Sequence, residues 1–176
     1  MAKYTSVGHM LRARIAETPN KDAFYSPTED GWRTYTWKDV ETHVDPLAAG
    51  LRSLGVVNGD RIALLCSTRI EWLFADLATN LAGCATTTIY PSSTAEDAQY
   101  ITADSGAVVV FAENDEQVQK FTQMRDQLGT VKVVINIDGT GSEDGWVKPL
   151  ADVVEQGKLW LSSQPNGLQD ILDELS

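Results

Sequence analysis

Apolar residues recur along the chain at three- and four-residue spacing, a pattern typical of helices with one buried face. Ser6 and Thr36 are suited to cap the first two of these helices, and Thr36 forms a capping box with Asp39. Thr94 and Asp97 have the same spacing before a later helix. We expect helices over residues 6–18, 36–54, 70–81, 94–104 and 115–128, a short one over 150–155 and the start of another over 168–175. Pro46 predicts a kink within the second helix.

Continuous apolar runs lie between these helices. Together with the β-branched run at residues 86–90, they predict strands at residues 61–66, 86–90, 107–111 and 131–137. Such runs suit a parallel sheet that is covered on both faces. Residues 23–25 and 32–35, joined at Asp30-Gly31, predict a hairpin near the start of the chain. The alternation of strands and helices predicts an α/β fold, with a mainly parallel sheet flanked by helices.

Composition narrows the function classes. The 176 residues contain 43% hydrophobic and 22% charged residues, as in an ordinary globular domain, and carry a net charge of −11. A nucleic-acid ligand requires a basic stripe, which is missing, and the same charge opposes docking on anionic lipid. No apolar stretch approaches the roughly 20 residues of a membrane span, and the first residues do not resemble a secretory signal. We therefore expect a cytoplasmic protein without a transmembrane segment.

Two cysteines, Cys66 and Cys84, lie in apolar runs and are expected to be buried free thiols. A disulfide framework or a zinc site would require more ligands at closer spacing, so no metal site is predicted. His9 and His43 fall on predicted helices outside any motif that pairs them with a nucleophile. We interpret both histidines as structural.

Two further segments allow a functional or a structural interpretation. Gly139-Thr140-Gly141 follows a strand, but Gly145 comes one place too late for a dinucleotide loop, and the neighbouring carboxylates oppose phosphate. An exposed acidic loop is the better interpretation. Arg69 and Glu71 stand beside Trp72 at a strand-to-helix junction, where ligands bind in parallel sheets. They equally form a charge pair at the start of a helix, where Glu71 complements the helix dipole.

Four segments together resemble the AMP-forming acyl-CoA synthetases. They contain Gly55-Val56 with Gly59-Asp60-Arg61-Ile62; Ser67-Thr68-Arg69-Ile70-Glu71-Trp72; Leu81-Ala82-Gly83 with Tyr90-Pro91-Ser92-Ser93-Thr94; and Asp104-Ser105-Gly106-Ala107 with Glu113. Their order and spacing are more specific than any one segment. The Glu-Trp and Tyr-Pro-Ser-Ser-Thr versions resemble the long-chain fatty-acid–CoA ligase branch, especially its bacterial members. The resemblance is good over residues 4–138 and weak in the tail.

The resemblance implies that residues 1–176 are part of a large N-terminal domain. Residues 6–36 would form a helix and hairpin, 37–138 the α/β core, and 139–176 a loop and tail leading to the ATP loop. That Thr-Ser-Gly-Thr-Thr-Gly loop does not occur in the printed sequence, so no catalytic residue is assigned. ATP, Mg²⁺, CoA and a fatty acid would be used by the full-length parent, and this chain alone would bind none of them tightly.

By the same resemblance, five residues are expected to lie near a substrate: Arg69, Glu71, Trp72, Tyr90 and Ser92. Ser92 stands where some relatives carry an arginine that faces CoA, so that contact is not carried over. Thr86 to Thr88 also depart from the family pattern, in which small apolar residues are commoner. We expect the chain to associate with the remainder of the synthetase, or with itself through exposed apolar surface.

Two alternatives remain beside the ligase interpretation. The chain could be a stand-alone binding or regulatory module of the same fold that has no chemistry. It could also be an unrelated flavodoxin-like signalling domain, although that class needs an acidic cluster at the strand ends and a downstream lysine, which the sequence does not supply.

Overall fold

A computed structural model describes residues 4–175 of the protein. Within this range, five strands form one parallel sheet in the order β4-β3-β5-β6-β7. The strands are β3 (Arg61–Leu65), β4 (Ala85–Ile89), β5 (Ala107–Ala112), β6 (Val133–Asn136) and β7 (Val147–Pro149). The four strands predicted from the sequence thus share one sheet, as expected.

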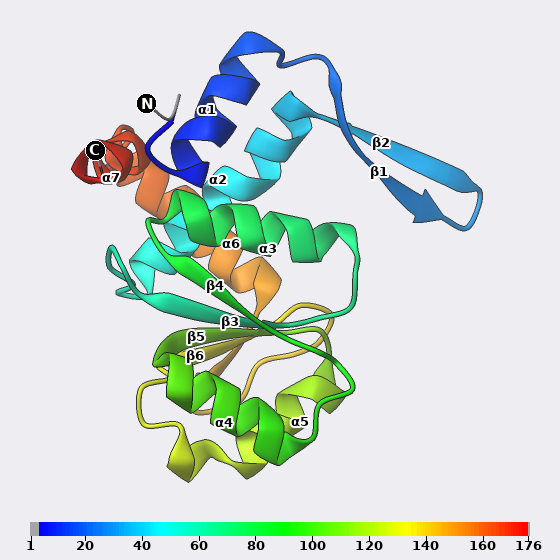
Figure 1. The fold of residues 1–176 in the computed structure, drawn as a ribbon, viewed down its shortest axis with the longest axis vertical. Coiled ribbons are helices and arrows are strands. Elements are labelled where there is room, and N and C mark those ends of the chain that lie inside the picture. Colours follow the sequence, from blue (N-terminus) through cyan, green and yellow to red (C-terminus); the bar gives the residue numbers. More distant parts are fainter. Residues whose placement is uncertain (1–3, 176) are drawn as a thin grey trace.

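Helices cover both faces of this sheet (Figure 1). The helices are α1 (Val7–Glu17), α2 (Trp37–Ser53), α3 (Ile70–Leu81), α4 (Ala95–Ser105), α5 (Asp115–Gln123), α6 (Leu150–Ser163) and α7 (Gly167–Glu174). In β3, Ile62 and Leu64 pack into the core beneath α2, α3 and α6, whereas Ala63 and Leu65 pack toward α4 and α5. This alternation explains why β3 is apolar throughout: a strand covered on both faces has no polar side.

Local hydrogen bonds confirm the predicted helix starts. The Ser6 hydroxyl accepts from the His9 N–H at the start of α1. At α2, the Asp39 N–H donates to the Thr36 hydroxyl oxygen at 3.2 Å, and the Thr36 N–H donates to Asp39 at 2.8 Å. The Thr94 hydroxyl likewise accepts from the backbone of Asp97. These contacts satisfy backbone donors that the first turn leaves free.

The hairpin consists of β1 (Asp22–Thr28) and β2 (Gly31–Thr36) and projects from the body of the molecule (Figure 1). Its base is anchored by aromatic contacts: Phe24 lies 5.7 Å from the Trp37 ring, and Tyr35 lies 5.5 Å from the Phe74 ring. Trp32, near the tip, is 70% exposed. The hairpin is therefore held at one end only.

Helices α2 and α6 approach each other closely. A Cβ atom added at Gly157 would lie 1.8 Å from the Pro46 carbonyl oxygen, and one added at Gly50 would lie 2.3 Å from the Val153 carbonyl oxygen. Helix α2 continues across Pro46 to Ser53. The two glycines therefore allow backbone-to-backbone packing that no side chain would permit.

One strand was not predicted, and two predicted helices have the wrong end. Residues Val147–Pro149 form the edge strand β7, which is too short to give a periodic signal and ends in a proline that an edge tolerates. Helix α6 runs to Ser163 rather than Glu155, because packing against α2 overrides the low helix propensity of Gly157. Helix α5 ends at Gln123, and residues Arg125–Gln127 form a separate 3₁₀ turn.

No helix within residues 4–175 is long and apolar enough to cross a membrane. Cys66 and Cys84 are buried free thiols, as predicted. Burial raises the pKa of Cys66 to about 12 and that of Cys84 to about 11. Both thiols therefore stay protonated at neutral pH.

Candidate functional site

The carboxyl ends of the parallel strands meet at one edge of the sheet. Helix α3, which follows β3, packs on one face, whereas α5, which follows the neighbouring β5, packs on the other (Figure 1). The chain therefore leaves the sheet in opposite directions after two adjacent strands. In open α/β sheets such a switch point is the usual place for a ligand. The segments after β3 and β5 are the natural place to look for a site.

Arg69, in the segment between β3 and α3, is at the centre of a charge network at this edge. Its Nε lies 2.5 Å from Glu71, and its two terminal nitrogens pair with Asp138, one of them at 3.1 Å. A further carboxylate oxygen, from Glu113, lies 3.6 Å away. Hydrogen bonds to Asp138 and Glu71 raise the pKa of the arginine. Three carboxylates thus surround one guanidinium group.

Glu113 joins the ends of two neighbouring strands. Its carboxylate accepts from the Ser67 backbone N–H at 3.0 Å and from the Ser67 hydroxyl at 2.5 Å. Burial raises the pKa of Glu113, but the hydrogen bonds from Ser67 and the charge of Arg69 outweigh it, so the net pKa is lowered. Glu113 is therefore ionised and fixes the segment after β3 against the segment after β5.

The balance of charge at this edge decides which ligands fit it. The only guanidinium in the network is already engaged by carboxylates, and those carboxylates are in excess. A triphosphate would meet like charge here and would have to displace Asp138 and Glu71 from Arg69. The edge residues therefore do not fit the bare phosphates of ATP.

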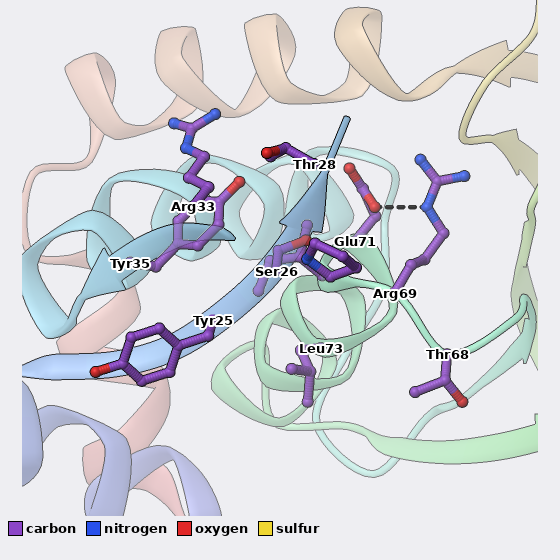
Figure 2. Close-up of a pocket in the computed structure, with 11 residues that line it drawn as sticks. Tyr25, Ser26, Thr28, Arg33, Tyr35, Thr68, Arg69, Glu71 and Leu73 are labelled. Carbon is purple, nitrogen blue, oxygen red and sulfur yellow. Dashed lines mark hydrogen bonds and ion pairs between the residues drawn. The ribbon is translucent and has the colours of Figure 1, made fainter. Parts of the chain in front are cut away.

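Two pockets lie on either side of the segment between β3 and α3. One, which we call the hairpin pocket, has a volume of about 470 Å³ and lies between that segment and the β1–β2 hairpin. Figure 2 shows Arg33, Tyr35, Glu71 and Arg69 around it. The other, the β4 pocket, has a volume of about 400 Å³ and is lined by Cys66, Thr88 and their neighbours after the two strands. The predicted site residues are divided between these two pockets.

Arg69 and Glu71 line the hairpin pocket as an ion pair, and Trp72 and Tyr90 line the β4 pocket. Ser92 is exposed and lines neither pocket. The structure therefore brings four of the five predicted residues to the carboxyl edge in two pairs. It also confirms that Arg69 and Glu71 form a charge pair at the start of a helix.

A lysine holds the loop that carries Tyr90 and Ser92. The Lys120 ammonium, from α5, donates to the carbonyl oxygens of Pro91 and Ser93, each at 2.7 Å. These charge-assisted hydrogen bonds fix the backbone on both sides of Ser92.

Sequence reasoning did not identify Glu113, Asp138 or Ser67 as parts of this edge. Each follows directly or closely after a strand that the sequence does predict. Because parallel strands end at the same edge, the residues that follow them are expected to meet. That rule would have found all three without the structure.

Fold and site together define an α/β domain with ligand-sized pockets at the carboxyl edge of a parallel sheet. The AMP-binding enzyme family matches residues 11–168, which is most of the chain. The chain belongs to the AMP-binding enzyme family.

The relatives agree with this assignment. The chain is 29% identical over 141 residues to the long-chain-fatty-acid–CoA ligase FadD15 of Mycobacterium bovis, covering 80% of this chain and 24% of that protein. It is 29% identical to the ligase heimdall of Drosophila melanogaster over 73% of this chain and 18% of the relative. The chain thus spans about a quarter or less of these relatives and resembles their N-terminal part.

Solved structures show the same fold. A Mycobacterium tuberculosis fatty acyl CoA synthetase matches with a TM-score of 0.70 and 25% identity, over 86% of this chain and 28% of that one. The anthranilate CoA ligase AuaEII, solved in complex with anthranoyl-AMP, matches with a TM-score of 0.73 and 21% identity, over 88% and 28%. The predicted α/β class, within the N-terminal domain of the adenylate-forming enzymes, is confirmed.

Proposed function

We propose that this chain is the N-terminal segment of a long-chain fatty-acid–CoA ligase and supplies one sheet-and-helix layer of its large domain. The observation that carries the proposal is the match over 80% of this chain to about a quarter of a fatty-acid–CoA ligase. In this proposal residues 6–36 are its helix and hairpin and residues 37–138 most of its α/β core. The segment 139–176, expected from the sequence to be a loop and tail, also adds the edge strand β7 and core residues from α6 and α7.

The parent enzyme would form an acyl-adenylate from ATP and then a thioester with CoA. In this proposal Arg69 and Glu71 border the substrate region on the hairpin side, and Trp72, Tyr90 and Ser92 border it on the β4 side. None of the five is placed as a catalytic group. The surplus of carboxylates around Arg69 supports the view that the phosphates are held by other parts of the parent.

The 176-residue chain alone is therefore expected not to activate a fatty acid. The test is release of pyrophosphate from ATP and Mg²⁺, with palmitate and CoA, by the purified chain. A full-length fatty acyl-CoA synthetase of the same family is the positive control. Turnover above the no-protein background would refute the proposed division of labour, whereas its absence beside an active control would support it.

A stand-alone module is the second candidate. One relative favours it, because the match covers most of that relative's length rather than about a quarter of it. The Mycobacterium tuberculosis protein Rv1549 is 30% identical over 118 residues, covering 67% of this chain and 65% of that protein. Reading the coding DNA beyond Ser176 distinguishes the two candidates. A continuing frame with a Thr-Ser-Gly-Thr-Thr-Gly loop supports the ligase segment, and a stop codon supports the module.

A further inference from the structure

A third pocket lies between the hairpin base and three helices, away from the strand ends. It has a volume of about 290 Å³, just below the range of roughly 300–1,000 Å³ for ligand pockets. We call it the Phe74 pocket. It is lined by Arg33, Tyr35, His43, Leu47, Glu71, Phe74, Leu150 and Val154.

Most of this lining is apolar. Leu47, Leu150 and Val154 contribute aliphatic groups from α2 and α6, and Phe74 contributes its ring from α3. The ring of Phe74 is held by its neighbours, since His43 stacks on it at 4.7 Å. A wall that is fixed in this way accepts a small apolar group without having to be ordered first.

Arg33 supplies the polar end of the pocket. It lines both the Phe74 pocket and the hairpin pocket, and its guanidinium carbon lies 4.6 Å from the centre of the Tyr35 ring. Within residues 4–175, no carboxylate lies within ion-pair distance of Arg33. Glu71 lines the same two pockets, but it is paired with Arg69 at 2.5 Å. The guanidinium of Arg33 is thus held over a ring. Its charge acts on the Asp39 carboxylate, but within residues 4–175 no side-chain hydrogen bond or ion pair engages it.

Two hydroxyl groups lie beside Arg33 on the hairpin. Ser26 is directly opposite it in the strand pairing, and cross-strand partners point to the same face. Thr28, two residues further along the same strand, also lines the hairpin pocket (Figure 2). Both hydroxyls line the hairpin pocket and not the Phe74 pocket, so Arg33 is the cation that the two pockets share.

We propose that the Phe74 pocket binds a small amphipathic carboxylate, with its apolar tail among Leu47, Phe74 and Val154 and its carboxylate on Arg33. A planar guanidinium matches a carboxylate with two parallel hydrogen bonds. A monoanion fits better than a phosphate, because Arg33 is a single cation, Glu71 is nearby and the chain carries a net charge of −11. This site is independent of the proposed ligase function and requires neither ATP nor CoA.

The test is titration of the purified chain with octanoate, followed by calorimetry and by amide NMR shifts, below the concentration at which octanoate aggregates. We expect one site, with shifts centred on the hairpin base, α2 and α6. Octan-1-ol, which has the same tail but no charge, should bind at least tenfold more weakly. Shifts spread over the surface, several equal sites or no binding would overturn the proposal.

Two matched variants locate the charge. Arg33→Gln removes the exposed guanidinium and should weaken octanoate binding by about ten- to a hundredfold, the range for a lost hydrogen bond to a charged group. Arg14→Gln makes the same change of net charge on the exposed side of α1 and should leave the affinity unchanged. Equal affinity in both variants would refute the role of Arg33.

A third variant tests the tail. Val154→Phe narrows the pocket from α6 and should abolish octanoate binding. Acetate has no apolar tail, so its affinity should be the same for this variant and for the unmodified chain. Unchanged octanoate affinity in Val154→Phe would contradict the proposed seat of the tail. If this variant does not fold, the comparison of Arg33→Gln with Arg14→Gln still decides the proposal.

Discussion

Replacing Gly157 with alanine sets helix propensity against helix packing. Gly157 lies in the interior of α6, where alanine is favoured over glycine by about 1 kcal/mol. A Cβ atom at this position would, however, lie 1.8 Å from the Pro46 carbonyl oxygen and 2.6 Å from the Gly50 nitrogen. Real Cβ atoms essentially never approach other heavy atoms more closely than 3.0 Å, so α6 must move away from α2 by about 1 Å.

The movement is costly because both clashing groups are backbone atoms on the face of α2 that packs against α6, and no rotamer change can remove them. Forcing extra volume into a packed interface costs about 1–3 kcal/mol, and occasionally more. Because the clash is between backbone atoms, we take the upper part of this range, about 2–3 kcal/mol. After the gain in propensity of about 1 kcal/mol, Gly157→Ala should lower the free energy of unfolding by about 1–2 kcal/mol. A change of 1 kcal/mol shifts the Tm of a chain of this size by about 2–4 °C.

The assay is urea unfolding followed by circular dichroism, together with thermal unfolding. Gly129→Ala is the matched control, because an added Cβ there meets nothing within 4 Å and the backbone carries no positive φ. That variant should be neutral or stabilised by up to about 1 kcal/mol, through the unfolded state. Gly157→Ala with stability equal to or above that of Gly129→Ala would refute the close approach of the two helices.

Three shorter predictions concern the rest of the chain. Cys66 and Cys84 should react slowly with a polar thiol reagent in the native state and rapidly in urea, because burial raises both pKa values to about 11–12. Hydrogen bonds from the N-cap residue lower the pKa of Asp39. The stability from Asp39 should therefore be present above its unfolded pKa and be lost as the pH falls through the lowered one, and acid titration of Asp39→Asn should lack this loss. Lys120→Met should speed amide hydrogen exchange in residues 90–94, because two carbonyl contacts disappear.

The sequence predicts the main sheet well because the dominant signal, burial on both faces, is local. Strands β3, β5 and β6 are apolar along almost their whole length, β4 is β-branched at Thr86 to Thr88, and each helix that follows begins with a capping residue or a charge. Residues Val147–Pro149 lack that signal, since three residues show no period. Helix α6 is underestimated for a different reason. Its continuation past Gly157 depends on a contact with α2, which lies about a hundred residues earlier and has no trace in the local pattern.

The residues of the candidate site also fall into two groups: those that the local sequence indicates, and those that only the tertiary structure brings together. Arg69 and Glu71 are found from the sequence because a strand-to-helix junction can be recognised locally. Their partners Glu113 and Asp138 come from two other strands, and only the strand order brings them together. The Phe74 pocket is harder still, since Arg33 reaches it from a hairpin that precedes the sheet in the chain. No spacing within one segment could indicate that pocket.

Two arginines border the hairpin pocket, and their partners give them opposite roles. Arg69 is surrounded by carboxylates from α3, from the end of β5 and from the end of β6. Its positive charge is therefore paired within the protein, where it holds the carboxyl edge together. Arg33 rests on Tyr35 without a carboxylate at ion-pair distance within residues 4–175. An anion that enters between them gains little from Arg69, because it must first displace a bound carboxylate. Arg69 therefore has a structural role at the hairpin pocket, whereas the guanidinium of Arg33 is available to bind an anion. The affinity for an anionic ligand should fall when Arg33 is replaced, and the loss of Arg33 alone should be enough.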